Sequence, residues 1–97
     1  MKKAEAKPIV FSRHSQVQMS LRGATEQEVI ETILKGQWLP AKYDRFRSKR
    51  RFNFGRPSPI TGVVYRFKDV EAIFKEEEDQ IVVITVKVYY SNEEGVT

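Results

Sequence analysis

The segment from Ile81 to Tyr90 constrains the fold most, because β-branched and aromatic residues fall on both of its faces. Only Thr85 and Lys87 interrupt this apolar sequence. A strand with this pattern is typical of a central position in a sheet that is covered on both sides. The polar residues 76–80 come directly before it and predict a hairpin turn. The C-terminal part of the chain is therefore expected to form a β-sheet.

Three segments upstream have weaker strand patterns. Residues 51–54 alternate polar and aromatic side chains, which suits a half-buried strand. Residues 63–67 are β-branched and aromatic, and they either end at a kink at Asp69 or continue into the apolar residues beyond it. Residues 37–44 are predicted to be extended, and Pro40 confines them to a sheet edge or a bulge. Together with the last strand, these segments predict an antiparallel meander.

Two helices are predicted before these strands, each from the signals at its ends. Ser12 can accept a free backbone N–H as an N-cap, and Gly23 ends the helix that follows. Thr25 and Glu28 have the spacing of a capping box, and the second helix stops at Gly36. The apolar residues of the second helix fall on one side and predict a packed face: Val29, Ile30, Ile33 and Leu34.

The order of these elements predicts one α+β domain over residues 1–97, a helical hairpin packed on one face of a twisted antiparallel sheet of about four strands. The apolar residues 9–11 are an edge strand or a hydrophobic anchor. Residues 1–7 and 91–97 are expected to be flexible tails. No apolar run approaches the roughly eighteen residues of a membrane span, and no secretory leader is evident. A soluble cytoplasmic protein without a membrane partner is expected.

The distribution of charge indicates the class of partner. Residues 1–68 hold 15 Lys and Arg against 5 Asp and Glu, a net charge of +10, whereas residues 69–97 hold 2 against 8, a net charge of −6. Positive charge gathered in one part of a chain favours a polyanion or an acidic protein as partner. The absence of Cys and the single His exclude a thiol nucleophile, a disulfide framework and a Cys or multi-His metal site. We expect no metal and no cofactor.

A basic cluster at residues 42–56 holds seven of the 17 basic residues, with aromatic residues between them. Cations neutralise phosphates and aromatic rings stack on unpaired bases, so RNA with exposed bases fits better than duplex DNA. The alternative is a solvated loop whose aromatic side chains enter the core, as expected for Phe52 and Phe54 more than for Tyr43 and Phe46. The candidate nucleic-acid-binding residues are Lys42, Arg45, Arg47, Lys49, Arg50 and Arg51.

His14 is the only histidine, the side chain best suited to take and give a proton near neutral pH. On the predicted helix, His14, Gln18 and Arg22 are four residues apart and share one polar stripe, which could hold a phosphodiester. The alternative is a hydrogen-bonded packing residue, because Val17 and Leu21 flank His14. The sequence leaves both interpretations open.

The motifs Ser12-x-His14 and Arg22-Gly23, followed by a capped helix and the final strand at 81–86, resemble a family of small prokaryotic domains of unknown function. That family is similar in layout to the RelE, ParE and BrnT toxins, within the barnase-like ribonuclease folds. The resemblance implies two helices on a four-stranded antiparallel sheet. It also implies a toxin-like role on RNA, as a metal-free ribonuclease or a ribosome-dependent mRNA interferase, with a small acidic antitoxin as protein partner.

The resemblance implies His14, Arg22 and Thr85 as catalytic residues. Ser15 and Gln18 depart from the Ala and Arg of the family pattern. The second departure removes one phosphate ligand from the helical stripe, which weakens the expectation of cleavage more than that of RNA binding. The alternative function is therefore a non-catalytic module that binds RNA or protein. The sequence leaves the oligomeric state open.

Overall fold

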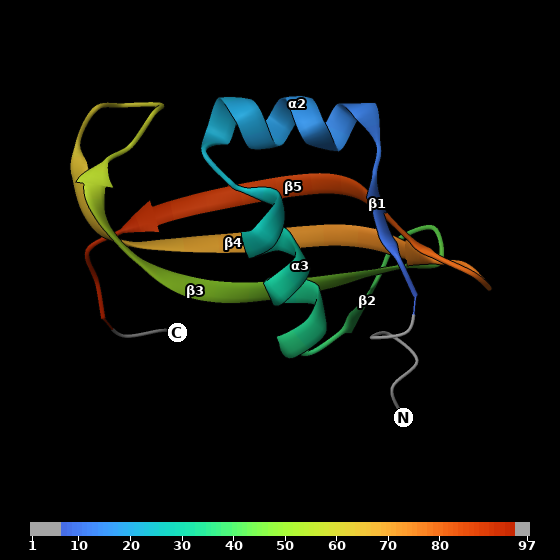
Figure 1. The fold of residues 1–97 in the computed structure, drawn as a ribbon. Helices are drawn as coiled ribbons and strands as arrows, with labels where there is room; N and C mark the ends of the chain where they lie inside the picture. Colours follow the sequence, from blue (N-terminus) through green and yellow to red (C-terminus); the bar gives the residue numbers. More distant parts are fainter. Residues whose placement is uncertain (1–6, 95–97) are drawn as a thin grey trace.

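Five strands form one mixed sheet in the order β1-β5-β4-β3-β2, and two helices cover one of its faces (Figure 1). This computed structural model describes residues 7–94 of the chain. The elements in chain order are β1 (Ile9–Phe11), α2 (Arg13–Arg22), α3 (Glu26–Lys35), β2 (Leu39–Ala41), β3 (Arg45–Pro57), β4 (Val64–Glu76) and β5 (Ile81–Ser91). The α+β class expected from the sequence is confirmed.

The sheet differs from the expected one in both strand number and strand direction. It has five strands rather than about four, and β1 pairs with β5 in parallel, with Ile9 opposite Ile81 and Phe11 opposite Val83. Two helices and three strands separate β1 from β5 in the chain, a connection long enough for parallel pairing. A backbone hydrogen bond from Ser12 to Val83 (2.9 Å) joins the end of β1 to β5. Residues 9–11 are thus an edge strand.

The helices pack on different strands rather than along one another as a hairpin. α2 lies along β5, whereas α3 crosses β4 and β3 (Figure 1). Their ends are those predicted: the Ser12 hydroxyl accepts from the Ser15 N–H (3.1 Å), and Gly23 ends α2 with a left-handed φ of 87°. Thr25 and Glu28 form the capping box of α3 through hydrogen bonds of 3.0 and 3.1 Å.

β3 and β4 are both 13 residues long and pair over most of their length. The sequence predicted only residues 51–54 of β3, which begins at Arg45 and ends at Pro57. β4 continues through Asp69 without a break. Asp69 is tolerated within the strand because Arg51 lies opposite it in β3 and donates to its carboxylate (2.8 Å).

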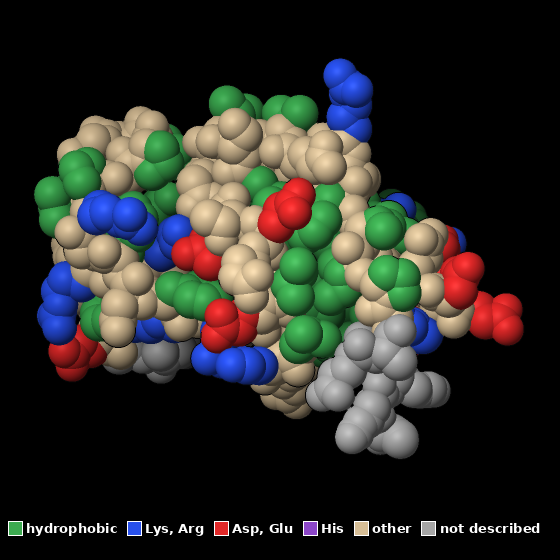
Figure 2. Space-filling model, in the orientation of Figure 1, with side chains coloured by type: hydrophobic (Ala, Val, Ile, Leu, Met, Phe, Trp, Pro, Cys, Tyr) green, Lys and Arg blue, Asp and Glu red, His purple; other side chains and the backbone are tan. Residues whose placement is uncertain are grey.

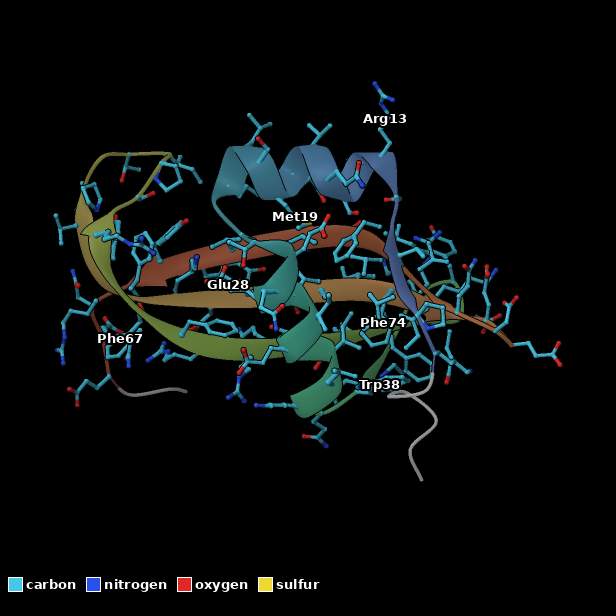
Figure 3. All side chains as sticks on the ribbon, in the orientation of Figure 1. Arg13, Met19, Glu28, Trp38, Phe67 and Phe74 are labelled. Atoms are coloured by element: carbon cyan, nitrogen blue, oxygen red, sulfur yellow. The ribbon has the colours of Figure 1, made fainter. Side chains whose placement is uncertain are left out.

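The core lies between the helices and the sheet face that they cover. Val70, Ala72 and Phe74, alternate residues of β4, are fully buried there. Trp38 follows α3 and packs on Phe74 and Phe46, with ring centroids 4.8 and 5.3 Å apart (Figure 3). Phe46, expected to be free for a partner, belongs to this aromatic cluster instead. Its position in β3 turns it toward the helices.

β5 is buried on one face only, so the predicted cover on both faces is wrong. Ile81, Val83 and Val86 are fully buried, and Val88 packs against the same core. The register between β4 and β5 shifts at Ile84, which is an extra residue in β5. Buried residues are therefore odd-numbered before the shift and even-numbered after it. One buried face consequently looks like two in the sequence.

Most of the expected tails lie outside the described residues, namely 1–6 and 95–97. Within the described part, Lys7 makes a 2.9 Å ion pair with Glu76, and β5 includes Ser91. Neither helix of the described chain is long and apolar enough to cross a membrane.

Candidate nucleic-acid interface

The sheet face away from the helices, called the open face here, carries the cations of β3. Side chains alternate along a strand, so the odd-numbered residues of β3 point away from Phe46 and Ser48, which face the helices. The register sets these odd-numbered residues beside those of β4 and β5. Three rows result: Arg47–Ile73–Thr85, Lys49–Glu71–Lys87 and Arg51–Asp69–Tyr89.

A cavity of about 660 Å³ opens on this face beside the turn between β2 and β3, and we call it the β2–β3 cavity. Its charged lining residues are Lys42, Arg45 and Arg47. Ile73 of β4 and Thr85 of β5 line it from the sheet. None of the described Asp and Glu residues lines the cavity. Three cations without a lining carboxylate make the cavity electropositive, which suits a phosphate group.

The turn between β2 and β3 holds an aromatic ring in solvent beside this cavity. Tyr43 and Asp44 have φ values of 62° and 58°, a left-handed conformation that residues other than glycine rarely adopt. Tyr43 is 80% exposed, and its ring lies 5.6 Å from the guanidinium carbon of Arg45. The two left-handed residues form the tight hairpin turn between β2 and β3, where successive positive φ values are common.

The structure divides the six predicted nucleic-acid-binding residues. Lys42, Arg45 and Arg47 line the cavity, and Lys49 occupies the next row of the open face, over the ring of Tyr89 (5.1 Å). Arg50 lies on the other face, and Arg51 is hydrogen-bonded to acceptors within the protein.

Arg50 and Arg51 are neighbours in sequence that point to opposite faces of the sheet. Arg50 turns toward α3 and lies 3.5 Å from Glu31. Arg51 donates to both carboxylate oxygens of Asp69, at 2.8 and 3.2 Å, and its pKa is raised mainly by these hydrogen bonds. It also donates to the backbone carbonyl of Glu93 (2.9 Å). Arg51 thus fastens the C-terminal segment to the sheet.

The three predicted catalytic residues lie on α2 and β5. Arg22 donates to the Val86 carbonyl (2.9 Å), and Gln18 accepts from the Val86 N–H (2.8 Å). The polar stripe of α2 therefore closes the edge of β5 beyond β1. Thr85 instead lines the β2–β3 cavity. Among the described residues, no hydrogen bond joins Arg22, Thr85 and His14 to one another.

His14 is an exposed residue of α2. The view of the helix-covered face in Figure 2 shows no histidine side chain. Val17 and Leu21 are 50% and 68% exposed, so they do not bury His14 against the core. The interpretation of His14 as a packing residue is therefore wrong.

β4 and β5 place three further charged residues on the open face that were not predicted as site residues: Glu71, Lys75 and Lys87. Glu71 lies 3.9 Å from Arg47 and accepts a hydrogen bond from the Tyr89 hydroxyl (3.1 Å). Burial and the charge of Glu71 raise the pKa of Tyr89. The alternation within 71–75 carries the signal for these residues, but it becomes readable only when the register with β3 is known.

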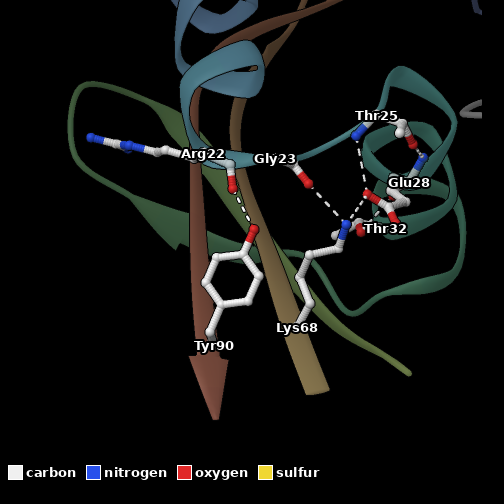
Figure 4. Close-up of polar contacts among 7 residues, drawn as sticks. All are labelled: Arg22, Gly23, Thr25, Glu28, Thr32, Lys68 and Tyr90. Carbon is white, nitrogen blue, oxygen red and sulfur yellow. Dashed lines mark hydrogen bonds and ion pairs between the residues drawn. The ribbon is translucent and has the colours of Figure 1, made fainter. Parts of the chain in front are cut away.

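A second polar group, on the helix-covered face, has a structural role (Figure 4). The Lys68 amine is buried and contacts the Gly23 carbonyl (2.8 Å) and the Glu28 carboxylate (2.9 Å). The Tyr90 hydroxyl donates to the Arg22 carbonyl. These contacts attach the junction of α2 and α3 to β4 and β5, so their polar atoms are satisfied within the fold.

Within residues 7–94, no three His, Asp or Glu side chains are grouped so as to hold a metal ion. No family model matches the chain, and no curated protein or solved structure shows significant similarity to it.

Proposed function

We propose that this protein binds single-stranded RNA on the open face of its sheet. One observation carries the proposal: Lys42, Arg45 and Arg47 surround a cavity that no described carboxylate lines. Arg47 is half-exposed, and its contact with Glu71 is long at 3.9 Å. Lys49 continues the positive surface toward β5. Cations arranged in this way can neutralise successive phosphates of one strand.

The helices of the structure favour single-stranded RNA over duplex DNA as the polyanion. The outer surface of α2 presents Val17 and Leu21, and Arg13 is the exposed cation at its start (Figure 3). α3 carries Glu26 and Glu28 in its first turn. A recognition helix needs several cations for phosphates besides donors for base edges, and each helix has one exposed cation, Arg13 in α2 and Lys35 in α3.

Charge reversal tests this interface. The variant Arg45→Glu/Arg47→Glu should bind a labelled single-stranded RNA about tenfold or more weakly, with a salt slope smaller by about 1 to 2, because two phosphate contacts are removed. Fluorescence anisotropy over a series of salt concentrations measures both values. The matched control is Arg13→Glu/Lys35→Glu, which makes the same change in net charge on the helix side.

Equal losses in the variant and its control would show that net charge alone, rather than this surface, attracts RNA. If the wild-type protein binds no RNA but binds an acidic polypeptide through Arg45 and Arg47, the partner is instead a protein, as the antitoxin-like interpretation requires. A ribosome-dependent protein would require the same cations, because ribosomal RNA presents the same phosphates.

Metal-free RNA cleavage is the second candidate function, consistent with a toxin-like ribonuclease. The observation that favours it is that Thr85 lines the same cavity as the cations, with Glu71 beside Arg47. In this reaction a base takes the 2′-hydroxyl proton and the 2′-oxygen attacks phosphorus. The bond from phosphorus to the 5′-oxygen breaks, and the leaving oxygen takes a proton from water. Cations stabilise the negative charge that develops at phosphorus. Glu71 lies outside the cavity lining, 3.9 Å from Arg47, and is the candidate base at the open face. Arg47 is placed to stabilise the charge.

A cleavage assay with end-labelled single-stranded RNA and a chelator tests this function. If the reaction occurs at the open face, Glu71→Gln should slow cleavage by about 100-fold or more, because a general base is lost. Thr85→Val reports on the cavity, and His14→Ala serves as the comparison on α2. A dominant loss in His14→Ala would place the reaction at the edge of β5 instead. If the wild-type protein binds RNA but does not cleave it, the cleavage proposal fails and the non-catalytic binding function remains.

A further inference from the structure

We propose that the β2–β3 cavity takes one unpaired nucleotide of the RNA, with the base stacked on Tyr43 and the phosphate held by Arg45 and Arg47. This inference rests on the proposed function and specifies its ligand. Three observations carry it: the composition of the cavity, the exposed ring at its rim, and an unsatisfied donor in its lining.

The cavity has the size and the two-sided chemistry of a nucleotide site. Its volume of about 660 Å³ lies within the roughly 300 to 1,000 Å³ typical of small-molecule sites. Its lining combines the apolar residues Pro40, Ala41 and Ile73 with the cations Arg45 and Arg47. A nucleotide combines a flat, largely apolar ring with a phosphate, so the lining offers contacts to both of its parts.

Tyr43 is placed as a stacking platform rather than as a core residue. Its ring is 80% exposed, although burial would be the ordinary fate of an aromatic side chain. Tyr43 lies in the tight hairpin turn between β2 and β3, which keeps its ring away from the core between the helices and the sheet. The guanidinium of Arg45 lies over one face of the ring, 5.6 Å from its centre, and the residue nevertheless remains 80% exposed. Bases stack on rings presented in this way.

Arg45 also contributes an unsatisfied donor. Its Nε–H is buried and has no hydrogen-bond partner among the described residues. A buried donor without an acceptor is unfavourable, so a guanidinium that turns onto a phosphate gains a hydrogen bond that the free protein lacks. The acceptor must be anionic or strongly polar, since Lys42 and Arg47 lie on the same cavity.

The site selects unpaired RNA because a base inside a duplex already has both ring faces covered by its neighbours. Only a base that has left the stack can place one face on Tyr43. The open face should therefore prefer single-stranded RNA over duplex RNA of the same sequence. Phosphate contacts alone would not give this preference.

The test compares ring variants of Tyr43 in the full-length protein. Tyr43→Ala should weaken binding of a labelled oligouridine by about tenfold, whereas Tyr43→Phe should bind as the wild type does, because the ring and not the hydroxyl stacks. Leu21→Ala, at another exposed position, on α2, is the control. Unlabelled single-stranded RNA should displace the probe at lower concentration than the same RNA in a duplex. Circular dichroism checks that each variant is folded.

Two results separate the failure of this inference from that of the proposed function. If Tyr43→Ala binds as the wild type does, and duplex competes equally, the nucleotide site is refuted, while loss of binding in Arg45→Glu/Arg47→Glu would keep the interface. If the wild-type protein binds no RNA at low salt, the interface and the nucleotide site both fail.

Discussion

Lys68 is the cation most completely withdrawn from water in the described chain. Its side chain is 3% exposed, and its amine contacts the Glu28 carboxylate (2.9 Å) and the Gly23 carbonyl (2.8 Å). A buried charge is tolerated only when it is paired and hydrogen-bonded. The pairing links the N-terminal turn of α3 and the end of α2 to β4. Removing the amine would take this partner from the partly buried Glu28 carboxylate and from the Gly23 carbonyl.

We predict that Lys68→Ala lowers the free energy of unfolding by about 3 to 5 kcal/mol, the range for breaking a buried ion pair. Urea denaturation followed by circular dichroism measures this loss. The control is Lys35→Ala, which removes an exposed partner of Glu31 on the same helix and should cost under about 1 kcal/mol. Similar losses in the two variants would contradict the structural role given to Lys68.

The roles of individual cations could be predicted only in part from the sequence. The basic cluster was evident from the sequence, and three of its cations, Lys42, Arg45 and Arg47, line one cavity. The opposite directions of Arg50 and Arg51 follow from strand alternation, but the sequence located β3 only from residue 51. Their acidic partners lie on α3 and β4, and such pairings depend on the register between distant segments.

At the scale of elements, the helices were predicted well because their signals are local. The Ser12 cap and the left-handed Gly23 need only their own neighbours, as does the capping box of α3. The strands were predicted less completely because pairing is not local. β1 pairs in parallel with β5, which is the last strand of the chain. No property of residues 9–11 alone specifies this pairing.

The extra residue in β5 had the largest effect on the prediction. Ile84 shifts the register, so that the apolar residues change from odd to even positions along one buried face. A continuous apolar sequence then predicts cover on two sides, although only the helix side is covered. The same shift leaves Thr85, Lys87 and Tyr89 together on the open face, where they extend the candidate interface.

At the scale of the whole molecule, the uneven charge of the sequence becomes an uneven surface. The antiparallel pairing of β3 with β4 brings acids of the C-terminal part beside the basic cluster: Asp69 faces Arg51, and Glu71 faces Lys49. These acidic residues neutralise part of the positive charge of the basic cluster. The surplus remains at the end of β3 near the β2–β3 cavity, which is why the binding proposal centres there.

The stability of the whole fold should fall at alkaline pH because two tyrosines of β5 have raised pKa values in the folded protein. Burial raises the pKa of Tyr90, and burial with the nearby charge of Glu71 raises the pKa of Tyr89. A raised pKa means that the folded protein holds the proton more tightly than the unfolded chain. The contribution of each tyrosine to the free energy of unfolding is thus complete below the unfolded pKa of about 10. It is lost as pH rises through the folded pKa.

We predict that Tyr90→Phe lowers the free energy of unfolding at neutral pH by about 1 kcal/mol, because its hydrogen bond to the Arg22 carbonyl is lost. Above about pH 10 the difference from wild type should narrow, since the wild-type hydroxyl then loses the proton that makes this bond. Tyr89→Phe should show the same narrowing from a smaller initial difference, because Tyr89 is 45% exposed. Urea denaturation at a series of pH values measures both curves. A constant offset across the alkaline range would show that neither hydroxyl couples its proton to folding.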